Sequence, residues 1–176
     1  MIINLENENK SKQKVESLIG KQLGLAQKFK NKKYGSNLYN LKKLNIVEKT
    51  SGVEPTENSR CNFEKFENGI LLRINDKQKL FGLVLSKESV NEIIIKKGSE
   101  EIVQISLAGF LNWIGIEKET IKKYRFLIGG FYIERFRLEI ITKSCSLSLD
   151  SSSGNYNIEK EYFIDSVLKA KLKIEE

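Results

Sequence analysis

The chain has 176 residues and a formal net charge of +7, a length that fits one domain with an extra segment or two small units. It contains no histidine, which excludes Ser-His-Asp and Cys-His catalysis and most zinc enzymes. It also has no GxxxxGK[ST] loop for nucleotide phosphates. The two cysteines, Cys61 and Cys145, match no zinc or CxxC spacing, and we expect them to be buried free thiols. We therefore expect no catalytic residues, no metal ligands, no cofactor and no enzymatic activity.

The N-terminal sequence, MIINLENENKSKQK, lacks the apolar region of a signal peptide. Elsewhere no run approaches the roughly 18–20 apolar residues that a membrane-spanning helix requires. From these features we expect a cytoplasmic protein without a transmembrane segment.

The positive charge is concentrated near the N-terminus. Residues 1–50 carry eleven Lys and four Glu, whereas residues 51–176 carry nineteen basic and nineteen acidic side chains. From Gln13 to Phe29 the apolar residues recur at helical spacing. A second short helix is suggested by three leucines spaced three apart, Leu38, Leu41 and Leu44. The sequence therefore predicts a basic, helical N-terminal segment.

The lysines of this segment form the first candidate binding site. A lysine cluster with an interleaved aromatic residue can follow a phosphate backbone and release counterions. Base-specific recognition is disfavoured because the segment contains no arginine. The alternative is a solvated helix face that keeps the protein soluble. The candidate polyanion- or partner-binding residues are Lys14, Lys21, Lys28, Lys30, Lys32, Lys33, Tyr34, Lys42 and Lys43.

Residues 51–60 contain the only proline and are predicted to be a linker between residues 1–50 and a domain over residues 61–176. Within this domain the apolar period shifts towards two, and Asn68-Gly69 is typical of a hairpin turn. A turn at Gly98 and Ser99 is expected to separate two further strands. The expected strands are residues 63–66, 70–74, 79–86, 91–97, 101–106, 134–142 and 145–150.

Helices are expected between these strands and after them. Residues 107–114 and residues 117 to about 127 form the inserted pair, and Asn157 caps a closing helix. The buried face of the closing helix is expected to include Ile158, Tyr162, Phe163 and Val167. The sequence thus predicts an α+β fold with a curled antiparallel sheet of about six to seven strands. This order of elements resembles, as a topology only, that of pleckstrin-homology-like barrels.

The stretch SLAGFLNWIG, residues 106–115, contains the only tryptophan. Core packing is the favoured interpretation, because Leu107, Phe110, Leu111 and Ile114 make one helical stripe with Trp113 off its centre. A partner-protein surface and a membrane surface are the alternatives, since aromatic and basic residues together are typical of an interfacial anchor. The candidate partner- or membrane-binding residues are Phe110, Trp113, Lys122, Lys123 and Arg125.

These features favour a non-enzymatic interaction or scaffold module that binds another protein or a second copy of itself. The alternative function is peripheral binding of anionic lipid or nucleic acid through the lysine-rich N-terminal segment.

Overall fold

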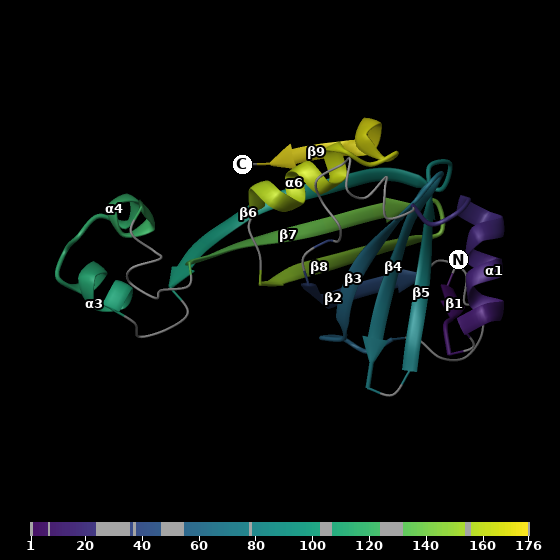
Figure 1. Cartoon of the computed structure of the whole chain (residues 1–176), viewed down its shortest axis with the longest axis horizontal. Coiled ribbons are helices and arrows are strands. Elements are labelled where there is room, and N and C mark those ends of the chain that lie inside the picture. Colours follow the sequence, from purple (N-terminus) through teal and green to yellow (C-terminus); the bar gives the residue numbers. More distant parts are fainter. Residues whose placement is uncertain are drawn as a thin grey trace.

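The computed structural model describes residues 2–6, 8–23, 36, 38–46, 55–77, 79–102, 107–123, 132–153 and 156–175. In these residues one large mixed β-sheet is accompanied by short helices (Figure 1). The strands are β1 (Ile2–Asn4), β2 (Leu38–Ile46), β3 (Arg60–Phe66), β4 (Gly69–Asp76), β5 (Lys79–Ser86), β6 (Val90–Ile102), β7 (Tyr132–Thr142), β8 (Cys145–Ser153) and β9 (Leu172–Glu175). The helices are α1 (Glu8–Ile19), α3 (Leu107–Trp113), α4 (Lys118–Lys123), α6 (Tyr156–Ile164) and the 3-10 helix η1 (Lys169–Lys171).

The order of the strands in the sheet is β1-β5-β4-β3-β2-β8-β7-β6-β9. Every pair is antiparallel except β6 and β9, which are parallel. The α+β class is therefore correct, but the expected antiparallel sheet or pleckstrin-homology-like barrel of six to seven strands is wrong. The sheet is mixed and has nine strands. The two edge strands escaped sequence analysis because β1 has three residues and β9 has the sequence LKIE, which gives no clear apolar alternation.

The expected helical N-terminal segment is also wrong in its extent, since α1 ends at Ile19 and residues 38–46 form a strand. A register shift between Leu41 and Lys43 marks a β-bulge in β2. The bulge places Leu41 and Leu44, three residues apart, opposite the inward-facing Leu149 and Leu147 of β8. A helical spacing of leucines therefore arises in a strand. β2 lies between β3 and β8, so the N-terminal part of the chain supplies an inner strand of the sheet.

The turn expected at Gly98 and Ser99 is instead an irregularity within the single long strand β6. The register with β7 shifts between Lys97 and Glu100, which leaves Gly98 and Ser99 as a bulge. A Cβ atom at Gly98 would lie 2.6 Å from the carbonyl oxygen of Arg135. Glycine is therefore required by the close approach of the two backbones, and not by a chain reversal.

α1 covers the outer face of the strands β3, β4 and β5. Val15 and Ile19 of α1 form one buried cluster with residues of these strands and of β1. The other members of the cluster are Ile3, Leu5, Phe66, Leu71 and Val84. This explains why the sequences of β4 and β5 are almost continuously apolar, because both faces of these strands are buried.

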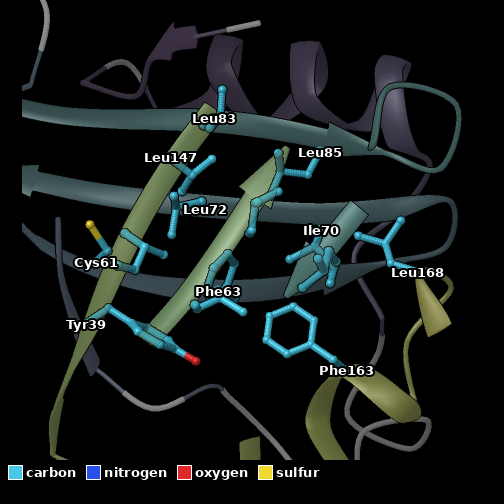
Figure 2. Packing of buried hydrophobic residues seen from close by; sticks show 14 of the residues in the cluster. Tyr39, Cys61, Phe63, Ile70, Leu72, Leu83, Leu85, Leu147, Phe163 and Leu168 are labelled. Carbon is cyan, nitrogen blue, oxygen red and sulfur yellow. The ribbon is translucent and has the colours of Figure 1, made fainter. Parts of the chain in front are cut away.

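The larger core lies on the inner face of the curved sheet, where α6 closes it (Figure 2). Tyr39, Phe63 and Phe163 form a chain of edge-to-face ring contacts, with centroids 5.3 and 5.5 Å apart. The prediction for the face of α6 was half right. Tyr162 and Phe163 are buried, but Ile158 and Val167 are exposed.

Candidate functional site

α3 and α4 lie apart from the body of the protein, beyond the ends of β6 and β7 (Figure 1). They contact each other, and the exposed apolar residues of α3 are the strongest candidate for a functional surface among the described residues. α3 covers most of the stretch SLAGFLNWIG and ends at Trp113.

The end of α3 is fixed by a Schellman motif. Gly115 has a φ of +89°, in the left-handed region that glycine adopts readily. Its N–H donates to the carbonyl of Asn112 at 3.1 Å, and the N–H of Ile116 donates to the carbonyl of Leu111 at 3.0 Å. These two hydrogen bonds define the motif and stop the helix. The cap therefore sets the direction in which the chain leaves Trp113.

Three large apolar side chains on and just after α3 are exposed. The exposed fractions are 52% for Phe110, 80% for Trp113 and 51% for Ile114. The rings of Phe110 and Trp113 are in contact, with centroids 5.9 Å apart. The core-packing interpretation of this stretch is therefore wrong. Phe110 and Ile114 belong to the predicted stripe, but within the described part of the structure the sheet covers neither of them. We call Phe110, Trp113 and Ile114 the aromatic surface.

The basic residues predicted to accompany the aromatic surface are less completely described. Lys122 and Lys123 are the last two residues of α4, and their side chains lie outside the described part of the structure, as does the whole of Arg125. Their proximity to Trp113 stays a prediction.

The structure does not bring the described N-terminal lysines together. Lys14 is exposed on α1 and Lys21 follows that helix, whereas Lys42 and Lys43 are exposed on β2. α1 packs against β4 and β5, and β3 separates these strands from β2. Lys42 is also held by Asp150, at 3.7 Å. The remaining candidates, Lys28, Lys30, Lys32, Lys33 and Tyr34, lie outside the described residues.

A buried polar cluster that was not predicted from the sequence lies beneath α6. The hydroxyl of Tyr39 donates a hydrogen bond to the carboxylate of Glu159, which is completely buried. Burial, followed by the nearby charge of Glu159, raises the pKa values of Tyr39 and Tyr162 well above their usual range. The ammonium of Lys65 lies 4.2 Å from the ring centroid of Tyr162. Because these groups are enclosed by the sheet and α6, we interpret them as a structural link between the two.

The cysteines are buried free thiols, as predicted. Burial raises the pKa of Cys61 to about 12, so its reactive thiolate is scarce at neutral pH. Cys145 packs its sulfur 3.2 Å from the hydroxyl oxygen of Thr142. The positions of both residues are typical of packing rather than of nucleophilic chemistry.

Within the described residues, no three His, Cys, Asp or Glu side chains come together in a way that could hold a metal ion. The search for membrane-spanning helices, over the same residues, found none of sufficient length and apolar character.

No protein-family model, curated protein or solved structure matches this chain.

Proposed function

We propose that this protein is a non-enzymatic interaction module that binds another protein through the aromatic surface of α3. The observation that carries the proposal is the 80% exposure of Trp113 beside Phe110. Tryptophan is enriched among the residues that dominate binding free energy at protein interfaces. We further propose that the protein acts in the cytoplasm.

The energetics support a binding role for these side chains. Full burial of a large apolar side chain contributes about 1.5–3 kcal/mol. Association also costs less free energy when the contacting groups are already ordered. Here the Schellman motif holds the end of α3, and the ring contact restricts the two aromatic side chains. The aromatic surface is thus partly organised before a partner arrives.

A protein partner is favoured over an anionic membrane by the small charge of this region. Residues 107–125 contain three Lys, one Arg and two Glu. Each basic residue near an anionic membrane contributes only about 1 kcal/mol. The attraction available from two excess basic residues is therefore small compared with the apolar contribution of the three side chains of the aromatic surface.

Photo-crosslinking in the native cell tests the proposal. A photoreactive amino acid replaces Ile114, which is exposed and follows Phe110 by one helical turn. We expect one discrete crosslinked protein, whose yield falls at least about tenfold with Trp113→Ala or Phe110→Ala, since a central interface aromatic contributes about 2 kcal/mol or more. The matched control is Val167→Ala, which shortens an exposed apolar side chain outside α3 and α4. An equal loss with the control, or no discrete product, contradicts the proposal.

Two further measurements distinguish a different protein partner from anionic lipid and from a second copy of this chain. Trp113 fluorescence with and without anionic vesicles reports on lipid, because this is the only tryptophan. A blue shift with vesicles would replace the proposal by membrane binding. Sedimentation over a range of concentrations identifies the case in which the partner is a second copy of this chain.

Binding of anionic lipid or nucleic acid by the lysine-rich N-terminal segment stays the alternative. The separation of Lys14 from Lys42 gives it less support than the aromatic surface has. Deletion of residues 1–50 is not a suitable test, because it removes β2 from the interior of the sheet. Replacing exposed lysines by glutamine and measuring the salt dependence of polyanion binding is suitable.

A further inference from the structure

A second candidate binding site lies between α1 and the outer face of β3 and β4, and it is independent of the aromatic surface. A pocket of about 200 Å³ opens there. Its lining combines apolar side chains with two cations and one carboxylate. These residues include Val15, Phe66 and Leu71, and the charged Lys12, Glu64 and Arg73. We call this feature the outer pocket.

The strand register shows that the residues of β3 and β4 in this pocket share one face of the sheet. Phe66 and Leu71 belong to the outer cluster together with Val15 of α1. Alternate residues of a strand point to the same face, so Glu64 lies on the face of Phe66, and Arg73 lies on the face of Leu71. Glu64 also pairs in register with Leu71. All four strand residues therefore face the side of the sheet on which α1 packs.

The two cations lie at the same end of the outer pocket. α1 packs along β5 and β4 (Figure 1), and its last residue, Ile19, contacts the start of β4, because a Cβ atom at Gly69 would lie 2.7 Å from Cγ2 of Ile19. Lys12 is seven residues back along α1 from this contact, about 10.5 Å at helical rise. Arg73 is four residues further along β4, about 13 Å at strand rise. Lys12 and Arg73 are therefore at similar levels, and the apolar part of the pocket lies between them and the contact.

The charges of the outer pocket are incompletely paired. Nε of Arg73 lies 3.1 Å from Oε1 of Glu64, but no acceptor in the described residues is aligned for a hydrogen bond from this buried atom. Lys12 is exposed, and in the described part of the chain it forms no ion pair. Two cations and one carboxylate give the pocket a net charge of +1. A ligand with a single negative charge therefore neutralises it, whereas a dianion leaves an excess charge beside Glu64.

We propose that the outer pocket binds a small monocarboxylic acid with an apolar body. The guanidinium of Arg73 has N–H donors besides Nε, in a planar arrangement that matches the two oxygens of a carboxylate, and Lys12 adds a point charge. The apolar body lies against Val15, Phe66 and Leu71. A cavity of about 150 Å³ holds one benzene molecule, whereas sites for drug-sized compounds begin near about 300 Å³. The volume therefore suits one ring, or a branched chain of similar size, with its carboxylate.

Titration of the full chain with benzoate, followed by amide chemical shifts, tests the proposal. We expect a dissociation constant of about 1 mM or below, with the largest shifts at Val15, Phe66 and Leu71. Benzamide has the same shape without the charge, and acetate has the charge without the ring, so both should bind at least about tenfold more weakly. Equal binding of either compound, shifts confined to other residues, or no binding up to about 10 mM benzoate overturns the proposal.

Charge variants test the position of the carboxylate. Arg73→Gln should weaken benzoate binding about tenfold or more, and Lys12→Gln about threefold or more, because each removes a cation that faces the carboxylate. The matched control is Lys14→Gln, which removes an exposed charge from the same helix outside the pocket. The amide spectrum of each variant shows whether it is folded. Equal weakening by Lys14→Gln contradicts the proposed site.

A variant with the opposite expected effect guards against loss of binding through misfolding. Glu64→Gln removes the carboxylate of the pocket and leaves its two cations, so benzoate binding should strengthen severalfold. Benzamide binding should not change, because benzamide carries no charge. Unchanged or weaker benzoate binding by a folded Glu64→Gln variant overturns the proposal.

Discussion

The two halves of the sheet are buried in different ways. β4 and β5 carry buried apolar residues on both faces, since α1 covers the outer face and the main core covers the inner face. In β7, by contrast, buried Phe136, Leu138 and Ile140 alternate with exposed Arg135 and Arg137. The outer face of this second half of the sheet is exposed to solvent and carries charged side chains.

The two halves therefore differ in what covers their outer faces within the described residues. The outer face of β4 and β5 is occupied by its own chain, and its side chains contribute to stability. The outer face of β6, β7 and β8 carries exposed ion pairs, such as Lys96–Glu139 and Arg137–Asp150, which contribute little to stability. The connection to α3 also belongs to this half.

The largest expected effects on the free energy of unfolding are at Leu71 and Leu72, which are neighbours in β4. Leu71 points to the outer cluster and Leu72 to the inner core, so alanine at either position should lower the free energy of unfolding by about 2–5 kcal/mol. In β7, Leu138→Ala should cost the same, whereas Ile141→Ala should cost less than about 1 kcal/mol because Ile141 is partly exposed. Urea denaturation measures all four. A small effect of Leu71→Ala would mean that α1 does not cover this half of the sheet.

Intermediate effects are expected at the polar link between β2 and α6. Tyr39→Phe removes the donor to the buried carboxylate of Glu159, and we expect a loss of about 1–3 kcal/mol in the free energy of unfolding. The buried Tyr162 provides a matched control, because Tyr162→Phe removes a hydroxyl that forms no hydrogen bond within the described residues. Equal costs for the two variants would contradict a specific role for the Tyr39–Glu159 pair.

The same tyrosines make stability sensitive to alkaline pH. Their pKa values are raised in the folded state, so the folded protein retains phenolic protons that the unfolded chain releases above its usual value of about 10. Their contribution is fully present below pH 10 and is lost as the pH rises further, by at most about 1.4 kcal/mol per pH unit for each group. The decline should be shallower in Tyr39→Phe, as measured by urea denaturation at several pH values. An unchanged slope would mean that Tyr39 ionises alike in both states.

The smallest effects are expected on the charged outer face. Lys173 of β9 forms an ion pair with Glu92 of β6, and its side chain is largely exposed. Lys173→Gln should change the free energy of unfolding by less than about 1 kcal/mol, and less still at high salt. A loss comparable to that of Leu138→Ala would show that this half of the sheet depends on its charges, and the comparison between the halves would no longer hold.

Strands with a simple local pattern were predicted closely. Residues 79–86 form β5 as expected, and the hairpin at Asn68-Gly69 joins β3 to β4. The full extents of β2 and β6 were not predicted. Each strand contains a bulge, and the extra residue changes which side chains share a face. Of the functional features, the aromatic stretch was recognised from composition but assigned to the core.

By itself, the sequence determined the α+β class, most of the strands, the buried thiols and the absence of histidine chemistry, since these depend on composition and on periods of two to four residues. Only the tertiary structure decided that β2 lies inside the sheet and that β9 runs parallel to β6. It also decided that Trp113 is exposed. The physical reason is that an apolar stripe specifies a face to be covered, but what covers it depends on which distant segments pack there.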